Sequence, residues 1–330
     1  MDRTGASCYV YAKASGMLAK SFTGQKSSIL YSVKSLPELW GLLFKDEVPS
    51  VPQTVLAQLI EKKAAAKFIY EFKKLLETYT KPDKVLINLL HWFDYENLKT
   101  AAAYLSTGRS EKPDFFDISP FNILDYSQWP DLKKMTAENE LQWYNKIPGV
   151  DEQQWLSHKL DIQFVNELLD SADKLSLFER NAVKKLIIKR YSMKNVIWVM
   201  RLKVYYNMKK EDIIKQIAYL DESKGDKDLF AQEALKIIDY DINTYEQWSK
   251  WKYSSLINGV EEAKIWKLDP KVVEERVAED FFISVKRAFH KYPFTAMVLV
   301  SWFFIKQNEL DNIRTVTEAV RLNVQLENVV

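Results

Sequence analysis

Three segments of this 330-residue chain repeat one another, and this repeat limits the possible folds more than any other feature. When Asn97, Asn195 and Asn312 are aligned, each is followed by Leu, Val or Ile and then by a helical pattern, in the segments FDYENLKTAAAYL, RYSMKNVIWVMRL and KQNELDNIRTVTEAV. A phenylalanine precedes the asparagines by 29, 31 and 31 residues, at Phe68, Phe164 and Phe281.

The asparagines lie 98 and 117 residues apart. This spacing is longer than the roughly 20 to 50 residues of a solenoid repeat, so each unit is expected to be a small helical subdomain. We therefore predict three similar units, over residues 1–107 with the N-terminal helix, 108–220 and 221–330. A chain of this length exceeds one usual core of about 250 to 300 residues, which agrees with several subdomains.

Strong helix breakers are scarce in the chain. It has only 8 glycines, and no proline lies between Pro148 and Pro270. Patterns of a helix start, Ser or Thr followed three residues later by Glu or Gln, occur at Ser35, Ser176 and Thr244. Alternating strand patterns bounded by turn pairs are missing, so we predict an all-α fold.

The polar residues around each asparagine predict a corner between two helices. In the last repeat we expect the apolar helix Phe294–Ile305 to end in a break at 306–309, with a second helix opening at Asp311. Asn97, Asn195 and Asn312 would then lie near a helix start, where a side-chain amide can bond a free backbone N–H group. The alternative interpretation is that these asparagines contact a partner.

Two cations follow the asparagines, at Lys99 and Arg314. If they lie in the first turn of a helix, a positive side chain meets the unfavourable end of the helix dipole. Such a placement suggests an acidic partner outside the chain, although a simply solvated surface position is the favoured explanation, since surface cations mostly contribute little.

Charge and cysteine content narrow the range of partners. The formal net charge is +2, from 47 basic and 45 acidic residues, which gives no reason to expect nucleic acid or an anionic membrane as the main partner. The single Cys8 excludes an intramolecular disulfide, and the N-terminus lacks a signal-peptide pattern, so we expect a reducing cytoplasm. The longest strongly apolar run, Phe294–Ile305, is shorter than the roughly 20 residues of a membrane span.

No motif for catalysis or cofactor binding is found in the sequence. It contains neither a GxxxxGK[ST] loop nor a GxGxxG turn after a strand, which disfavours a nucleotide site. The histidines His91, His158 and His290 are too far apart to share a metal on one helix. Clustered aspartates of the DDxxD kind, which hold magnesium in helical cyclases, are also missing. We therefore expect no enzyme activity and no cofactor.

The three corner segments, together with YVYAKASGMLAKSF and PELWGLLF near the N-terminus, resemble the C subunit of bacterial and archaeal V/A-type ATPases, which is equivalent to eukaryotic subunit d. The resemblance covers nearly the whole chain. The last corner is the most specific part, because the family pattern there is matched by Lys306, Glu309, Asn312, Ile313 and Arg314.

This sequence departs from the family pattern at three positions. Gln307 stands where Glu is usual, Ser192 replaces the Asp expected three residues before Asn195, and Ala103 takes a place often held by Arg, whereas Arg201 keeps its counterpart. These differences put individual contacts in doubt, and the residues expected at corners or partner contacts are Asn97, Lys99, Asn195, Arg201, Asn312 and Arg314.

The resemblance implies a funnel of three helical subdomains about a pseudo-threefold axis. It also implies a non-catalytic rotor subunit that receives the end of the central shaft, from subunits of the D and F type, and is seated on the proteolipid ring at the cytoplasmic face of the membrane. Such a subunit transmits torque and neither binds nucleotide nor spans the bilayer. An α-helical scaffold or adaptor unrelated to rotation is the alternative that the repeats alone leave open.

Overall fold

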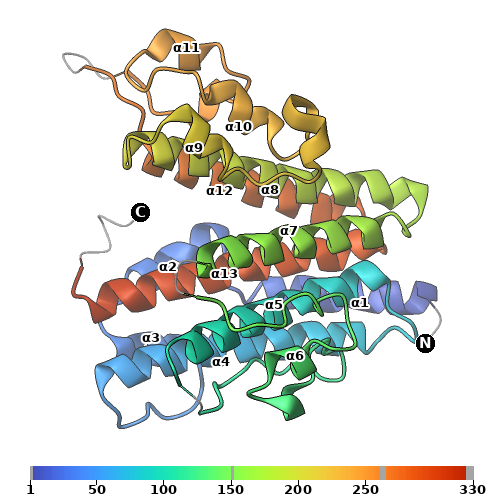
Figure 1. Cartoon of the computed structure of the whole chain (residues 1–330). Helices are drawn as coiled ribbons and strands as arrows, with labels where there is room; N and C mark the ends of the chain where they lie inside the picture. The colour runs from blue at the N-terminus through green and yellow to red at the C-terminus, as the bar shows by residue number, and fades with distance from the viewer. Residues whose placement is uncertain (1–2, 110, 150–151, 261–264, 325–330) are drawn as a thin grey trace. The chain divides into compact units, whose positions relative to one another are not determined.

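The computed structural model describes residues 3–109, 111–149, 152–260 and 265–324, and their regular structure is helical with no strand. The all-α prediction is confirmed. The helices are α1 (Arg3–Leu18), α2 (Ser27–Tyr31), α3 (Leu36–Leu43), α4 (Gln53–Leu76), α5 (Lys84–Ser106), α6 (Leu132–Met135), α7 (Gln153–Ala172), α8 (Leu177–Val204), α9 (Lys210–Ile214), α10 (Gln232–Ile237), α11 (Tyr245–Ser249), α12 (Pro270–Lys291) and α13 (Ala296–Arg321), as Figure 1 shows.

The contacts between residues divide the chain into two compact units. The first unit joins residues 1–179 to residues 286–330, and the second comprises residues 180–285. The chain therefore passes from one unit to the other inside α8 and again inside α12. The division into three repeat units and their threefold arrangement stay predictions.

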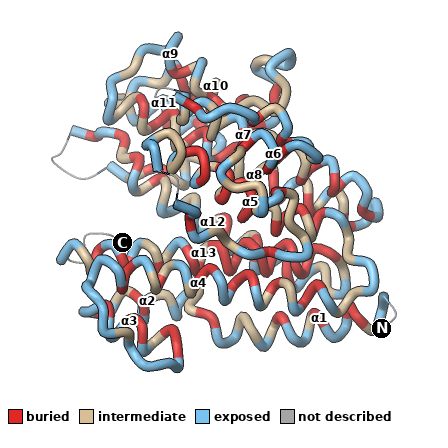
Figure 2. Tube along the Cα trace, turned by 60° about the horizontal axis from the view of Figure 1, so that its bottom comes forward, coloured by how far each residue is buried: buried red, intermediate tan, exposed pale blue. Residues whose placement is uncertain are grey.

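The core of the first unit is built around α13, which runs beside α4 and α5 (Figure 1). Phe68 and Phe72 of α4 meet Trp302 and Phe303 of α13, with ring centroids 5.0 to 5.7 Å apart. Buried residues gather along α13 in Figure 2. Removing one such ring typically costs about 3–5 kcal/mol, so this cluster holds the two helices together.

The predicted break at 306–309 is wrong, because α13 is continuous through it. Lys306, Gln307 and Glu309 look like a solvated turn in the sequence, yet all three are buried. Lys306 forms an ion pair with Glu309 one turn further along the helix. Paired in this way, the two charges are tolerated inside a helix.

The core of the second unit contains three tryptophans. Trp248 is fully buried and lies among a cluster that includes Trp251, Trp266, Val196 and Met200. The short helix α11 places Trp248, whose indole N–H donates to the backbone oxygen of Asp241 at 2.7 Å. The abundant aromatic residues of this region therefore fill the core.

Long helices of successive repeats pack in a regular order. In the first unit α5 packs on α7, and α13 packs on α4. In the second unit α8 is joined to α12 by Lys189 and Asp280, 2.6 Å apart, and by Arg201 and Glu274. The second helix of each repeat thus meets the first helix of the next repeat, and the last repeat meets the first.

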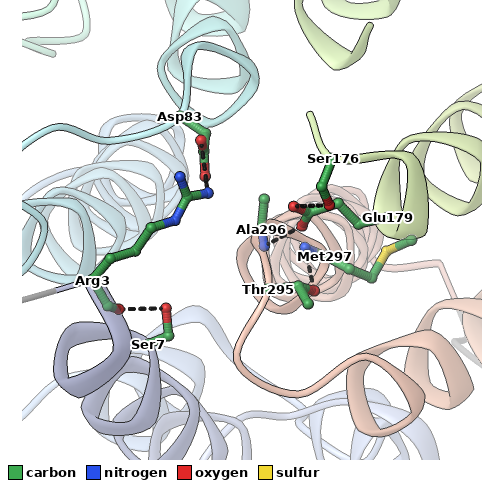
Figure 3. Close-up of polar contacts among 8 residues, drawn as sticks. All are labelled: Arg3, Ser7, Asp83, Ser176, Glu179, Thr295, Ala296 and Met297. Atoms are coloured by element: carbon green, nitrogen blue, oxygen red, sulfur yellow. Dashed lines mark hydrogen bonds and ion pairs between the residues drawn. The ribbon is translucent and has the colours of Figure 1, made fainter. Parts of the chain in front are cut away.

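The starts of α8 and α13 share one carboxylate (Figure 3). Glu179 accepts a hydrogen bond from the Ser176 hydroxyl at 3.0 Å and another from the backbone N–H of Ala296 at 2.8 Å. The sequence predicted that Glu179 would complete the start of its own helix with Ser176. Its carboxylate in addition caps α13, where a negative charge favours the helix dipole.

No helix among the described residues is long and apolar enough to cross a membrane.

Candidate functional site

Asn97 lies in the middle of α5 and not near a helix start. Its amide nitrogen donates to the backbone oxygen of Phe116 at 2.9 Å, and its amide oxygen accepts from the backbone N–H of Phe116 at 2.9 Å. The nitrogen also contacts the Tyr126 hydroxyl at 2.5 Å. The capping interpretation is therefore wrong for Asn97, which fastens the loop after α5 onto the helix.

Asn195 makes the same contact in the second repeat. It lies in the middle of α8, accepts from the backbone N–H of Ala218 at 2.9 Å and donates to the backbone oxygen of Ala218 at 2.7 Å. A second bond reaches the backbone oxygen of Phe230 at 3.0 Å. Both asparagines are buried. We call this two-way bond between a helix asparagine and one backbone residue of a loop the asparagine clamp.

An acidic residue three positions before the asparagine strengthens the clamp in two repeats. Asp94 accepts from the backbone N–H of Ile123 at 2.6 Å and from the Tyr126 hydroxyl. Glu309 accepts from the backbone N–H of Phe22 at 2.6 Å. In the second repeat the corresponding residue is Ser192, which is buried.

Burial raises the pKa of Asp94 to about 6, while hydrogen bonds from Tyr126 and from the backbone N–H groups of Ile123 and Leu124 work against that rise. Burial also raises the pKa of Tyr126, and the neighbouring Asp94 adds to the effect. The pair is shielded from water and serves to hold the loop.

The third repeat takes its loop from the other end of the chain. Asn312 lies within α13 and accepts from the Tyr31 hydroxyl at 3.3 Å, while Glu309 holds Phe22. Residues 19–44, which contain Phe22 and Tyr31 and include α2 and α3, pack on α13. The N-terminal segment therefore supplies the loop that follows the second helix in the other two repeats.

The three predicted cations have acidic neighbours within the chain. Lys99 of α5 pairs with Asp161 of α7 at 2.6 Å and with Glu96 at 2.8 Å. Burial alone would lower the pKa of Lys99, but these two carboxylates raise it above its usual value. Lys99 lies mid-helix, so the predicted clash with a helix dipole is wrong.

The other two cations follow the same rule. Arg201 of α8 pairs with Glu274 of α12. Arg314 of α13 lies 3.7 Å from Asp311, and its charge lowers the pKa of Glu61 on α4, where burial is the larger, raising influence. All three cations thus have acidic neighbours within the chain, and whether they also contact a partner stays a prediction.

The main open feature beside the third repeat is a groove of about 470 Å³ between α1, α4 and α13. Its apolar wall includes Met17, Phe22, Phe44, Phe68 and Leu310. Lysines 13, 20 and 67 lie along it, and the buried Lys306 and Glu309 line it as well. We call it the α1–α13 groove.

Among the described residues, some lysines of the α1–α13 groove form ion pairs and others do not. Lys306 lies 3.2 Å from the Ser21 hydroxyl and 3.5 Å from Glu71, in addition to its pair with Glu309. Lys13 and Lys20 are exposed and make no ion pair with another described residue. The groove is therefore suited to an apolar surface that carries acidic groups.

The histidines lie apart. His91 is half-buried, and desolvation lowers its pKa to about 4. His290 contacts the Tyr11 hydroxyl at 3.1 Å. Within the described parts of the chain, no group of three or more His, Cys, Asp or Glu side chains is arranged to hold a metal ion.

Several residues of the site were not singled out from the sequence. Ser21, Phe22 and Tyr31 lie before the first aligned segment, which begins near Phe68, and Glu71 lies on α4. They carry no motif that could have marked them, because their partners Lys306, Glu309 and Asn312 lie more than 200 residues away in the sequence.

The chain can be compared with a known protein family and with a related protein. The sequence pattern of a protein family described as ATP synthase (C/AC39) subunit matches residues 10–329. An uncharacterized protein from Treponema pallidum (strain Nichols) is 24% identical over 320 residues, which cover 97% of this chain and 94% of that protein.

Proposed function

Because the chain belongs to the ATP synthase (C/AC39) subunit family and is thus a subunit of a V/A-type ATPase, we propose that it is the non-catalytic central-stalk subunit that couples the shaft to the membrane ring. In this role it receives the end of the shaft, made by subunits of the D and F type, and rests on the proteolipid ring at the cytoplasmic face. It transmits torque in ATP-driven ion transport or ATP synthesis.

The order of helix contacts is the observation that carries the proposal. Each second helix is fastened to the first helix of the next repeat, through Lys99, Arg201 and the packing of α13 on α4. A closed order of this kind agrees with three units around one axis. It also resists shear, because a displaced unit would break contacts on both of its sides, and a torque-transmitting body needs that property.

The asparagine clamps add stiffness in the first two repeats, and Glu309 does so in the third. Asn97 and Asn195 bond their loops in two directions, and Asp94 and Glu309 hold a further backbone N–H group each. Loops on a protein surface are otherwise the parts that yield first under load. With the loops fastened, torque would pass through the helices with little loss in loop motion.

The proposal is tested by reconstitution of the complete ATPase with and without this chain. We expect that the complex lacking it still hydrolyses ATP in its headpiece but no longer transports ions, since shaft and ring are disconnected. Co-purification should recover the chain together with shaft subunits and the ring. Full ion transport without the chain would reject the coupling role, and recovery with unrelated proteins alone would favour a general scaffold.

A further inference from the structure

The three turns that join the paired long helices lie at one end of the first unit. They span residues 77–83 between α4 and α5, 173–176 between α7 and α8, and 292–295 between α12 and α13. Figure 3 shows Asp83, Ser176 and Thr295, one residue from each turn, in a single close-up. The second and third turns are bonded through Glu179, as described above. The charge of Glu179 also acts on Tyr79 of the first turn.

This end exposes large apolar side chains. Leu177 and Phe178 follow the second turn and are 76% and 71% exposed, and Phe294 in the third turn is 51% exposed. The two exposed aromatic rings each contact another ring. Phe178 contacts Tyr292 and Phe294 contacts Tyr11, with ring centroids 5.6 Å apart in both pairs. Apolar residues of this size at such exposure are costly in water, so a covering surface is expected.

Phe294 is held outward against its backbone preference. Its φ of 63° lies in the left-handed region, which glycine and asparagine adopt readily and phenylalanine rarely does. A bulky residue in this conformation is strained, and such strain concentrates at functional sites. Glycine would relieve this strain.

A lysine accompanies each turn: Lys81, Lys174 and Lys291 are all exposed, and none forms an ion pair with another described residue. Two acids of the first turn, Glu77 and Asp83, are already paired with Lys74 and Arg3. The three lysines are therefore available to an external anion, near in sequence to the exposed Leu177, Phe178 and Phe294.

We propose that this end, formed by Leu177, Phe178, Phe294, Lys81, Lys174 and Lys291, is a lipid-contacting surface that inserts its apolar side chains among the headgroups of an anionic bilayer. Single apolar side chains that project from turns and are flanked by lysines suit the boundary between headgroups and acyl chains. A protein partner for projecting side chains would have to offer matching pockets, whereas a lipid layer adapts to them. The lysines add attraction to anionic headgroups.

The test is co-sedimentation of the full chain with vesicles of phosphatidylcholine, alone or mixed with phosphatidylglycerol. We expect binding to the anionic vesicles that weakens with salt. Leu177→Ser combined with Phe178→Ser should lower the partition coefficient by about tenfold or more, because both apolar side chains would leave the acyl boundary. Replacing Lys81, Lys174 and Lys291 with Gln should remove the preference for anionic vesicles.

Two further variants separate lipid contact from folding. Phe294→Gly removes the side chain and relieves the backbone strain, so it should melt no lower than the wild type while binding vesicles more weakly. Trp155→Ser on α7, where the native tryptophan is 62% exposed at the other end of that helix, is the matched control and should bind like the wild type.

Wild-type protein that ignores both vesicles, or variants that bind as well as the wild type, would overturn the proposal. Binding to a detergent-solubilised proteolipid ring through the same residues, without vesicle binding, would reassign this end to a protein contact and reject the lipid contact. The experiment needs no ATPase activity, so its failure is distinguishable from failure of the coupling role.

Discussion

Asn97 uses both ends of its side-chain amide on one backbone residue, Phe116, and Asn195 does the same with Ala218. The third member of the repeat is weaker, because Asn312 is half-buried and accepts one longer bond from Tyr31. When the three repeats are aligned by sequence, the asparagines take equivalent positions. Their contacts show that two of them are clamps and the third is a reduced version.

This difference predicts unequal costs of substitution. Asn97→Ala and Asn195→Ala should each lower the free energy of unfolding by about 1–3 kcal/mol, because buried backbone groups of the loop lose their partners. Asn312→Ala should cost clearly less. Urea denaturation of the three variants measures the order, and a larger loss at Asn312 would show that its main partner lies elsewhere.

Asp94 gives a second prediction, which concerns how the stability of the protein depends on pH. Its pKa is about 6 when folded and near its usual 3.8 when unfolded, so the folded protein keeps a proton that the unfolded chain has released. This contribution to stability is fully present below about pH 4 and is lost as the pH rises through 6. At about 1.4 kcal/mol per pKa unit, the loss reaches about 3 kcal/mol.

The measurement compares wild type with Asp94→Asn by denaturation at several pH values from 4 to 7. The free energy of unfolding of the wild type should fall relative to the variant as the pH rises through this range. Parallel curves for the two proteins would mean that Asp94 ionises normally in the folded state.

At the scale of elements, α13 shows what sequence patterns miss. The polar residues at 306–309 were interpreted as a break because charges in an apolar stretch usually reach solvent. The structure buries them against Ser21, Phe22 and Glu71, which come from other parts of the chain. Helix class and most long helices follow from local patterns, whereas a buried charge depends on partners that are more than two hundred residues away in sequence.

The buried pair in α13 carries the third prediction. Glu309→Gln keeps an oxygen for the N–H of Phe22 but leaves Lys306 charged and without its nearest carboxylate, so it should cost about 3–5 kcal/mol. Combining Glu309→Gln with Lys306→Met should recover part of this loss, because the buried charge is gone. Thermal and urea unfolding of the single and double variants test the coupling, and simple additivity would show that the two residues act independently.

At the scale of the whole molecule, the repeat and the absence of nucleotide motifs from the sequence both agree with a helical, non-catalytic subunit. The family identified from the corner residues is confirmed by the match over residues 10–329. The pairing of repeats through Lys99 and Arg201 could not be predicted, because their partners Asp161 and Glu274 lie in the next repeat and carry no motif of their own.

The fourth prediction is that the isolated chain neither binds nor hydrolyses ATP, since its sequence contains no phosphate-binding loop. Isothermal calorimetry with ATP and magnesium should show no saturable heat. Micromolar binding with no other subunit present would contradict a purely mechanical subunit.

The closing of the third repeat by residues 19–44 also has a consequence for biosynthesis. A ribosome releases this segment long before α13, so Phe22 and Tyr31 meet Glu309 and Asn312 only after more than 280 further residues have been made. The first two repeats can fasten their loops soon after those loops are synthesised. The third is completed only once α13 has been made, so a product truncated before α13 would lack this closure and expose the apolar residues that α13 covers.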